Sequence, residues 1–369
     1  MINIQEVKTK KDLQTFIRFP RKLYKGNPYY APTLERGEKA DFTSNPTVKF
    51  CTYKLWLARR DGKVVGRIAG IINHKCNEHW RQQRVRFGWI DFVNDIAVAK
   101  ALLDTVEAWG KENGLTEIHG PCGFSNMDKQ GMLIEGFEES IPTAGVYNFF
   151  YYPALLEQLG YAKDVDWIQY EMNASQPVPD AVERISDIIC RKYQVNVKSF
   201  KKTKEILPYA HKFFYALNES FKDIYNFIPL TDEEIDYQTK KYFSLLRPDL
   251  VSIVTDKEDN IIGFALSMPS FTKAFQKAQG RLFPFGWYHI MKALKNYEII
   301  DLYYNGVHPD WQNKGIHALY HNALNHTYIK RGARLGISTQ QLETNLATRV
   351  WEKYNGRQHI RRRCYLKGL

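Results

Sequence analysis

The sequence repeats one order of predicted elements, and this repeat limits most strongly what the chain can fold into. In the first half, residues 55–72 form the pattern strand, tight Asp-Gly turn, strand, which is typical of a β-hairpin. Residues 250–266 have the same order of strand, turn and strand in the second half, with Asp-Lys-Glu-Asp-Asn at the turn. Because a repeated order of secondary-structure elements indicates that the same structural unit occurs twice, we predict two related domains in tandem.

The elements after each hairpin also agree between the halves. Each half continues with a strand that contains an acid, Asp91 or Asp301, and with a helix closed by glycine, over 97–113 and 315–331. A further strand, a short helix and a last strand complete each copy. The pattern predicts an α/β (α+β) fold in which each domain has a mixed, mostly antiparallel sheet flanked by helices.

A proline-punctuated polar stretch near the middle of the chain sets the predicted boundary. At roughly 100–200 residues per domain, 369 residues favour two domains. We therefore predict an N-terminal domain over 1–174, a linker over 175–180 and a C-terminal domain over 181–369.

Composition and charge narrow the compartment and the partners. No apolar run approaches the ~18–20 residues of a membrane span, and the chain does not begin like a signal peptide. The five cysteines are scattered and form no CxxC pair, so we expect a soluble cytoplasmic protein with free thiols and no metal. The net charge of +12 would attract a polyanion, whether a phosphorylated cofactor, a nucleic acid or an acidic membrane face.

The most informative motif is the junction between a strand and a helix at 307–317, Val-His-Pro-Asp-Trp-Gln-Asn-Lys-Gly-Ile-His. It resembles the acyl-CoA-binding loop of the GNAT acyltransferase superfamily, in which Val-x-Pro is followed by (Arg/Gln)-x-x-Gly-x-(Gly/Ala). His317 stands where the family has a small residue. The resemblance implies tandem GNAT-like domains, with acetyl-CoA or another acyl-CoA as co-substrate, and the following cofactor-binding residues: Val307, Gln312, Asn313, Lys314, Gly315, Ile316, His317 and Asn345.

Simple electrostatics explains why such a junction suits coenzyme A. The first helical turn leaves N–H groups without partners inside the helix and carries the positive end of the helix dipole, so it binds a diphosphate well. Gly315 has no Cβ to hinder the approach of the phosphates, and Lys314 adds positive charge. Loop amides from Gln312 to His317 can form an anion-binding nest.

The corresponding junction of the first half lacks these features. Residues 91–101 contain no Gly-x-Gly or Gly-x-Ala, and their first basic residue is Lys100. Asp95 is placed to cap the following helix itself. We therefore predict that the N-terminal domain has no coenzyme A loop.

The resemblance also implies candidate catalytic residues. Asp301 stands on the strand before the loop and is the candidate base for the amine, although Asp91 occupies the matching place in the other copy, which favours a structural role. Trp351 stands where many family members have the tyrosine that protonates the leaving thiolate. Tyr354 lies one turn further on and could substitute, or could pack in the core.

Two segments are candidates for the walls of the substrate cleft. Residues 270–296 are rich in aromatic side chains and could form a lid or a helix packed on the surface. Residues 125–137 form a loop with two glycines that could line the other side of the cleft.

The resemblance implies an acyl-CoA-dependent N-acyltransferase, most simply an acetyltransferase, that acts on a small-molecule or peptide amine. One alternative is a non-catalytic tandem protein that binds RNA or another anionic partner. Another is an aminoacyl-tRNA-dependent transferase, because that architecture also resembles the peptidoglycan-bridge enzymes. The sequence identifies neither the acceptor nor the oligomeric state.

Overall fold

The structure, a computed structural model, describes residues 1–369 apart from 179, 244, 346–350 and 352–354. The first half contains β1 (Ile2–Glu6), α1 (Lys10–Leu23), α2 (Glu35–Thr43), β2 (Cys51–Arg60), β3 (Lys63–Asn73), α3 (His74–His79), β4 (Arg84–Phe92), α4 (Ile96–Glu112), β5 (Glu117–Gly120), β6 (Met132–Glu135), α5 (Tyr151–Gln158) and β7 (Ala162–Asn173). The second half contains α6 (Asp180–Tyr193), β8 (Asn196–Ser199), α7 (Ala210–Phe221), α8 (Asp232–Phe243), β9 (Val251–Thr255), β10 (Ile261–Pro269), α9 (Thr272–Ala278), α10 (Gly286–Ala293), β11 (Ile299–Val307), α11 (Ile316–Arg331), β12 (Leu335–Ser338), β13 (Gln341–Leu342) and β14 (Arg357–Gly368).

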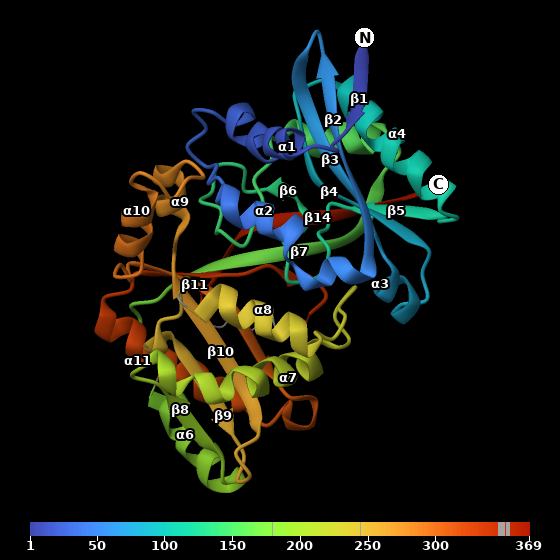
Figure 1. Cartoon of the computed structure of the whole chain (residues 1–369). Helices are drawn as coiled ribbons and strands as arrows, with labels where there is room; N and C mark the ends of the chain where they lie inside the picture. Colours follow the sequence, from blue (N-terminus) through green and yellow to red (C-terminus); the bar gives the residue numbers. More distant parts are fainter. Residues whose placement is uncertain (179, 244, 346–350, 352–354) are drawn as a thin grey trace.

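Over the described residues, the strands form one 14-stranded sheet that passes through both halves (Figure 1). Its order is β1-β2-β3-β4-β5-β14-β7-β12-β11-β10-β9-β8, with β13 on β7 and β6 on β14. Among the described pairs only β4–β5 and β11–β12 run parallel. The predicted fold class, a mixed and mostly antiparallel sheet flanked by helices, is confirmed.

Local sequence explains the hairpins on which the repeat was recognised. In the β2–β3 turn, Asp61 and Gly62 have φ values of 49° and 73°, the left-handed conformation that an Asp-Gly pair adopts at low cost. β9 and β10 pair antiparallel in the same way in the second half. The two hairpins predicted from the repeat are therefore confirmed.

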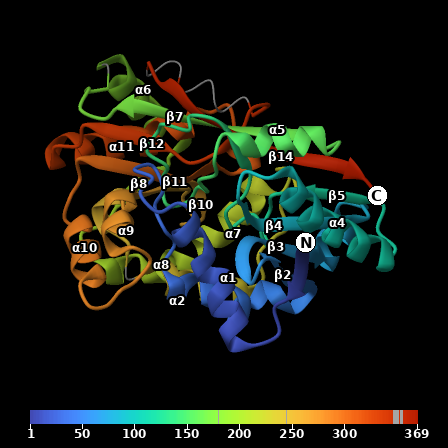
Figure 2. The same cartoon turned by 90° about the horizontal axis from the view of Figure 1, so that it is seen from above.

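The last strand of the chain lies inside the first half of the sheet. β14 pairs antiparallel with β7, from Arg357 opposite Glu171 to Leu366 opposite Ala162, and its other edge pairs with β5. β7 in turn pairs with β12, so the ladder continues from one half to the other. Both chain ends consequently lie on the same half of the molecule (Figures 1 and 2). The predicted linker follows β7 and runs into α6, and the boundary itself stays a prediction.

Helices cover both faces of each half of the sheet. In the first half α4 packs on one face, in the cluster with Leu102 and Val106, and α1 and α2 pack on the other, with Phe16 and Phe42. In the second half α6 and α11 share one core, while α7 and α8 form another on the opposite face. Successive strand residues alternate between the clusters, as a sheet buried on both faces requires.

Candidate active site

β11 and β12 lie side by side only over their first residues. Their parallel pairing ends at Leu302 and Ser338. Beyond that point β11 keeps its antiparallel partner β10, but within the described ranges no strand pairs with its other edge. Just beyond the end of this pairing, the Thr339 Oγ1 atom donates a hydrogen bond to the backbone carbonyl oxygen of Tyr303 in β11, at 3.0 Å. The strands thus open a gap beside residues 304–307, and the candidate site begins there.

The loop after β11 adopts a conformation that only certain residues accept. Asn313 and Gly315 have φ values of 60° and 78°, and Gly315 is the N-cap of α11. A Cβ built on Gly315 would lie 2.5 Å from the Cδ1 atom of Ile189 in α6. The structure therefore gives a reason for glycine that differs from an approach to phosphate: a left-handed backbone packed closely against a neighbouring helix.

The ammonium group of Lys314 lies close to this loop. Its Nζ atom lies 4.7 Å from the centre of the Trp311 ring and 5.9 Å from that of Tyr193. A cation over an aromatic face is attracted by the ring electrons. The charge predicted from the sequence is thus located beside the first turn of α11.

A large cleft of about 1220 Å³ lies between the two halves and is lined by residues of both. Such a volume exceeds the ~300–1,000 Å³ that encloses one drug-sized ligand, so the cleft has room for two substrates. Lys314 and Gly315 adjoin the lining along the chain. The other predicted cofactor residues all line the cleft: Val307, Gln312, Asn313, Ile316, His317 and Asn345.

His317 is exposed and lies one turn before His321 on α11. Burial, together with the nearby His317, lowers the pKa of His321 to about 3. The His321 ring, which packs edge-on against Trp351 at 5.5 Å, is therefore neutral at physiological pH. Lys314 and the start of α11 supply positive charge beside this end of the cleft.

The equivalent junction of the first half is already occupied by its own side chains. The Oδ1 atom of Asp95 accepts a hydrogen bond from Ala97 N at 2.8 Å, at the start of α4. The hydrogen bond from Arg60 lowers the pKa of Asp95, so the carboxylate stays charged there. Asp91 is held by Arg67 at 2.8 Å and by the Tyr24 hydroxyl at 2.7 Å. A carboxylate at a helix start repels phosphate.

The structure describes one of the two predicted catalytic residues, Asp301. Asp301 is fully buried where β11 is still paired on both sides, with Met268 of β10 and Ile337 of β12, and it does not line the cleft. Burial raises the pKa of Asp301 to about 7, while the nearby Ser270 hydroxyl acts in the opposite direction. Tyr354 lies outside the described residues. Trp351 is buried, and its Nε1 atom donates to Gln341 Oε1 at 2.9 Å.

The cleft contains a cluster of charged residues that the sequence did not reveal. Asp41 of α2 and Asp128 of the loop after β5 both line the cleft near Tyr304, and Lys241 of α8 lies 3.3 Å from Asp41 Oδ1. Burial, reinforced by Asp41, raises the pKa of Asp128 to about 6. Burial lowers the pKa of the neighbouring Lys129 to about 8. These residues come from three distant segments, so no spacing in the sequence indicates them.

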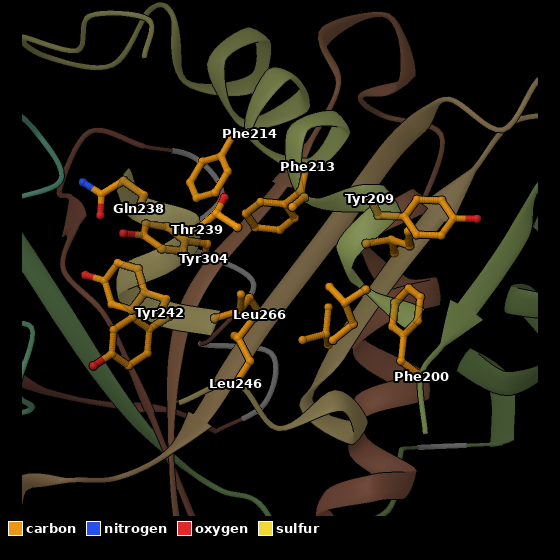
Figure 3. Close-up of a pocket in the computed structure, with 15 residues that line it drawn as sticks. Phe200, Tyr209, Phe213, Phe214, Gln238, Thr239, Tyr242, Leu246, Leu266 and Tyr304 are labelled. Atoms are coloured by element: carbon orange, nitrogen blue, oxygen red, sulfur yellow. The ribbon is translucent and has the colours of Figure 1, made fainter. Parts of the chain in front are cut away.

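A narrow apolar pocket opens beside this cluster of charged residues. Tyr242, Tyr303 and Tyr304 line both the pocket and the cleft. From their end, side chains of α7 and β10 such as Phe213 and Leu266 lie in a row toward Phe200 and Tyr209 (Figure 3). The pocket volume of about 50 Å³ is several times what one water needs. It can hold a short apolar stretch of a ligand.

Comparison with known proteins supports the fold. No protein-family profile matches the chain. Protein YghO of Escherichia coli is 29% identical over 289 residues, covering 78% of this chain and 73% of that protein. A bacterial ceramide synthase of Caulobacter vibrioides is 25% identical over 303 residues, covering 80% and 77%. The solved structure of a tandem GNAT protein from clavulanic acid biosynthesis superposes with a TM-score of 0.59 at 10% identity, covering 100% of this chain and 98% of that one. The predicted resemblance to tandem GNAT proteins is thus confirmed at the level of the fold.

Proposed function

We propose that this chain, which has the tandem GNAT fold, is an acyl-CoA-dependent N-acyltransferase whose second half binds the co-substrate. The observation that carries the proposal is the asymmetry between the two junctions. The β11–α11 junction opens onto the cleft through a left-handed loop beside Lys314, whereas Asp95 caps its counterpart. The former combines backbone donors with the charge of Lys314, the combination that a diphosphate requires, whereas at the latter Asp95 already pairs with Arg60 and accepts from Ala97 N.

The residues around the gap fit the thioester end of an acyl-CoA. The pantetheine arm would enter between β11 and β12, where the edge of residues 304–307 offers backbone groups that no described strand occupies. A backbone N–H there would polarise the thioester carbonyl, an arrangement that stabilises the charge developing on oxygen. Asn345 is proposed to contact the arm, and Tyr354 to supply the proton to the leaving thiolate.

The cluster of charged residues in the cleft, Asp41, Asp128 and Lys241, fits the amine acceptor. Asp41 and Asp128 would attract its ammonium form, and a group with a pKa of about 6 is mostly ionised at pH 7 and can accept the proton that must leave. Asp301 is the second proposed base. Because it is buried off the cleft, it would have to act through an intervening group.

The apolar pocket supports an acceptor that carries an apolar chain next to its amine. The pocket meets the cleft at Tyr242, Tyr303 and Tyr304, beside Asp128. The name of the Caulobacter relative points the same way, since a ceramide is the N-acyl derivative of a long-chain amino alcohol. We therefore propose a long-chain amine as the acceptor and a fatty acyl-CoA as a donor to be tested beside acetyl-CoA.

The test is the release of the coenzyme A thiol from acetyl-CoA or palmitoyl-CoA in the presence of different amines. We expect release to require both substrates and to be faster with a long-chain amino alcohol than with its short-chain counterpart or a peptide amine. No release with any pair, together with tight binding of RNA, would favour the non-catalytic alternative. Transfer from aminoacyl-tRNA in place of an acyl-CoA would favour the other alternative, an aminoacyl-tRNA-dependent transferase.

A further inference from the structure

The segment between β10 and β11 presents aromatic side chains to solvent. α9 and α10 form this segment, and α10 with the turn before it exposes five large apolar residues, each between 49% and 75% accessible. We call them the aromatic patch: Phe283, Phe285, Trp287, Tyr288 and Met291. Single exposed apolar residues are ordinary, but five within nine consecutive residues mark an interaction surface.

The aromatic patch is held in place from below. The opposite side of α10 buries Gly286 and Ile290, and Ile290 packs with Met268 and Phe271 in one cluster. The segment is also tied to the first half, because Glu35 N donates to Gly280 O at 2.9 Å. The outward face of α10 is therefore fixed, and its apolar side chains cannot turn into this core.

Around the aromatic patch the charge is basic. Between Asp259 and Glu298 the chain contains no acidic residue. Glu35 of α2 lies 3.6 Å from Arg281, but it also pairs with Arg18 and Arg21. The basic rim of the patch consists of five exposed residues: Lys273, Lys277, Arg281, Lys292 and Lys295.

We propose that the aromatic patch and its basic rim dock on the surface of an anionic lipid bilayer. Aromatic rings settle at the level of the lipid headgroups, and lysine and arginine side chains are drawn to anionic lipids. In the part of the chain that is described, no helix is long and apolar enough to cross a membrane, so the contact lies on the bilayer. The proposal does not depend on acyl transfer.

The position of the surface gives docking a consequence. α9 precedes the patch in the chain, and its residue Phe275 and its N-cap Phe271 both line the cleft. A docked molecule would hold its cleft close to the lipid surface, where an amine or acyl chain with low solubility in water resides. The same basic and apolar side chains would serve both to bind and to orient the protein.

The experiment is co-sedimentation of the full chain with vesicles of phosphatidylcholine alone or mixed with phosphatidylglycerol. We expect binding to the mixed vesicles that weakens at high salt, and little binding to phosphatidylcholine. Near an anionic surface each basic residue contributes roughly fivefold to the partition coefficient, so Lys292→Gln with Lys295→Gln should lower it roughly 25-fold. Phe285→Ser with Trp287→Ser should lower it at least about tenfold.

The matched control is Phe150→Ser, which removes an equally exposed aromatic ring at the start of α5. This variant should bind as the unchanged chain does, and all variants should keep their thermal unfolding midpoint because the altered residues are exposed. Absence of binding to mixed vesicles at low salt would overturn the proposal. It would also be overturned if both double variants bound as tightly as the unchanged chain. Self-association through the patch without vesicle binding would assign the surface to a protein contact and overturn it too.

Discussion

Gly315 and Ile189 touch across the junction of α11 and α6, and a Cβ on the glycine would come within 2.5 Å of the Ile189 Cδ1 atom. The contact ties the shape of the candidate coenzyme A loop to the helix that follows the predicted linker. It also means that substitutions at Gly315 affect packing and loop conformation together.

We predict that Gly315→Ala lowers the free energy of unfolding by about 2–4 kcal/mol, because it adds left-handed strain to a clash in the core. Gly332→Ala is the matched control. Gly332 has a similar φ of 73° but no atom within 4 Å of its would-be Cβ, so it should cost only about 1 kcal/mol. Urea unfolding measures both. Equal losses, or no partial rescue of Gly315→Ala by Ile189→Ala, would contradict this account of the contact.

Asp301 should make stability depend on pH. Its pKa is raised by burial from an ordinary value near 4 to about 7, so the folded state binds a proton more tightly and loses stability as pH rises between these values. The loss is at most about 4 kcal/mol for a shift of this size. We predict that Asp301→Asn lacks this loss, so that its stability relative to the parent is greater at pH 8 than at pH 5, measured by urea unfolding at both. The same pH dependence in the variant and the parent would show that Asp301 is not the group responsible.

Asp128 should set the acidic limb of the activity profile. If it accepts the amine proton, kcat/KM should rise with pH through about 6, and Asp128→Asn should lower it at least about 100-fold. Asp236→Asn, on the outer part of α8 and paired with His211, serves as the control. A limb that survives in Asp128→Asn but disappears in Asp301→Asn would transfer the role to Asp301.

Filling the apolar pocket should select against long acceptors. Ala210 lines the pocket at the start of α7, and Ala210→Leu should lower kcat/KM about tenfold for a long-chain amine and leave a short-chain amine unchanged. Lys212→Leu adds a similar side chain on the exposed side of the same helix and should have no effect. Equal loss for both amines would mean that the pocket does not receive the acceptor.

Local chemistry determines which features could be predicted from the sequence. The Asp61-Gly62 turn, the glycine that closes α11 and the capping by Asp95 depend on neighbouring residues, so their patterns indicated them correctly. The insertion of β14 between β5 and β7 joins residues far apart in sequence, and no local pattern encodes it.

The same distinction applies to the candidate site. The loop residues that line the cleft are contiguous, and a motif could find them. Asp41, Asp128 and Lys241 meet only because a helix, a loop and a second helix from different halves face one cleft. Asp301 was expected near the chemistry from its place on β11, but the strand opens one residue later, after Leu302.

The central claim is that one acyl-CoA binds per chain, at the β11–α11 junction. Isothermal titration of the chain with coenzyme A tests it most directly, alongside Lys314→Ala and the control Lys330→Ala at the opposite end of α11. We predict one site per chain, weakened at least roughly tenfold by Lys314→Ala, since a charge-assisted contact contributes about 1.5–3 kcal/mol, and unchanged by Lys330→Ala. Two equivalent sites, no binding, or one site with the same affinity in Lys314→Ala would contradict the account.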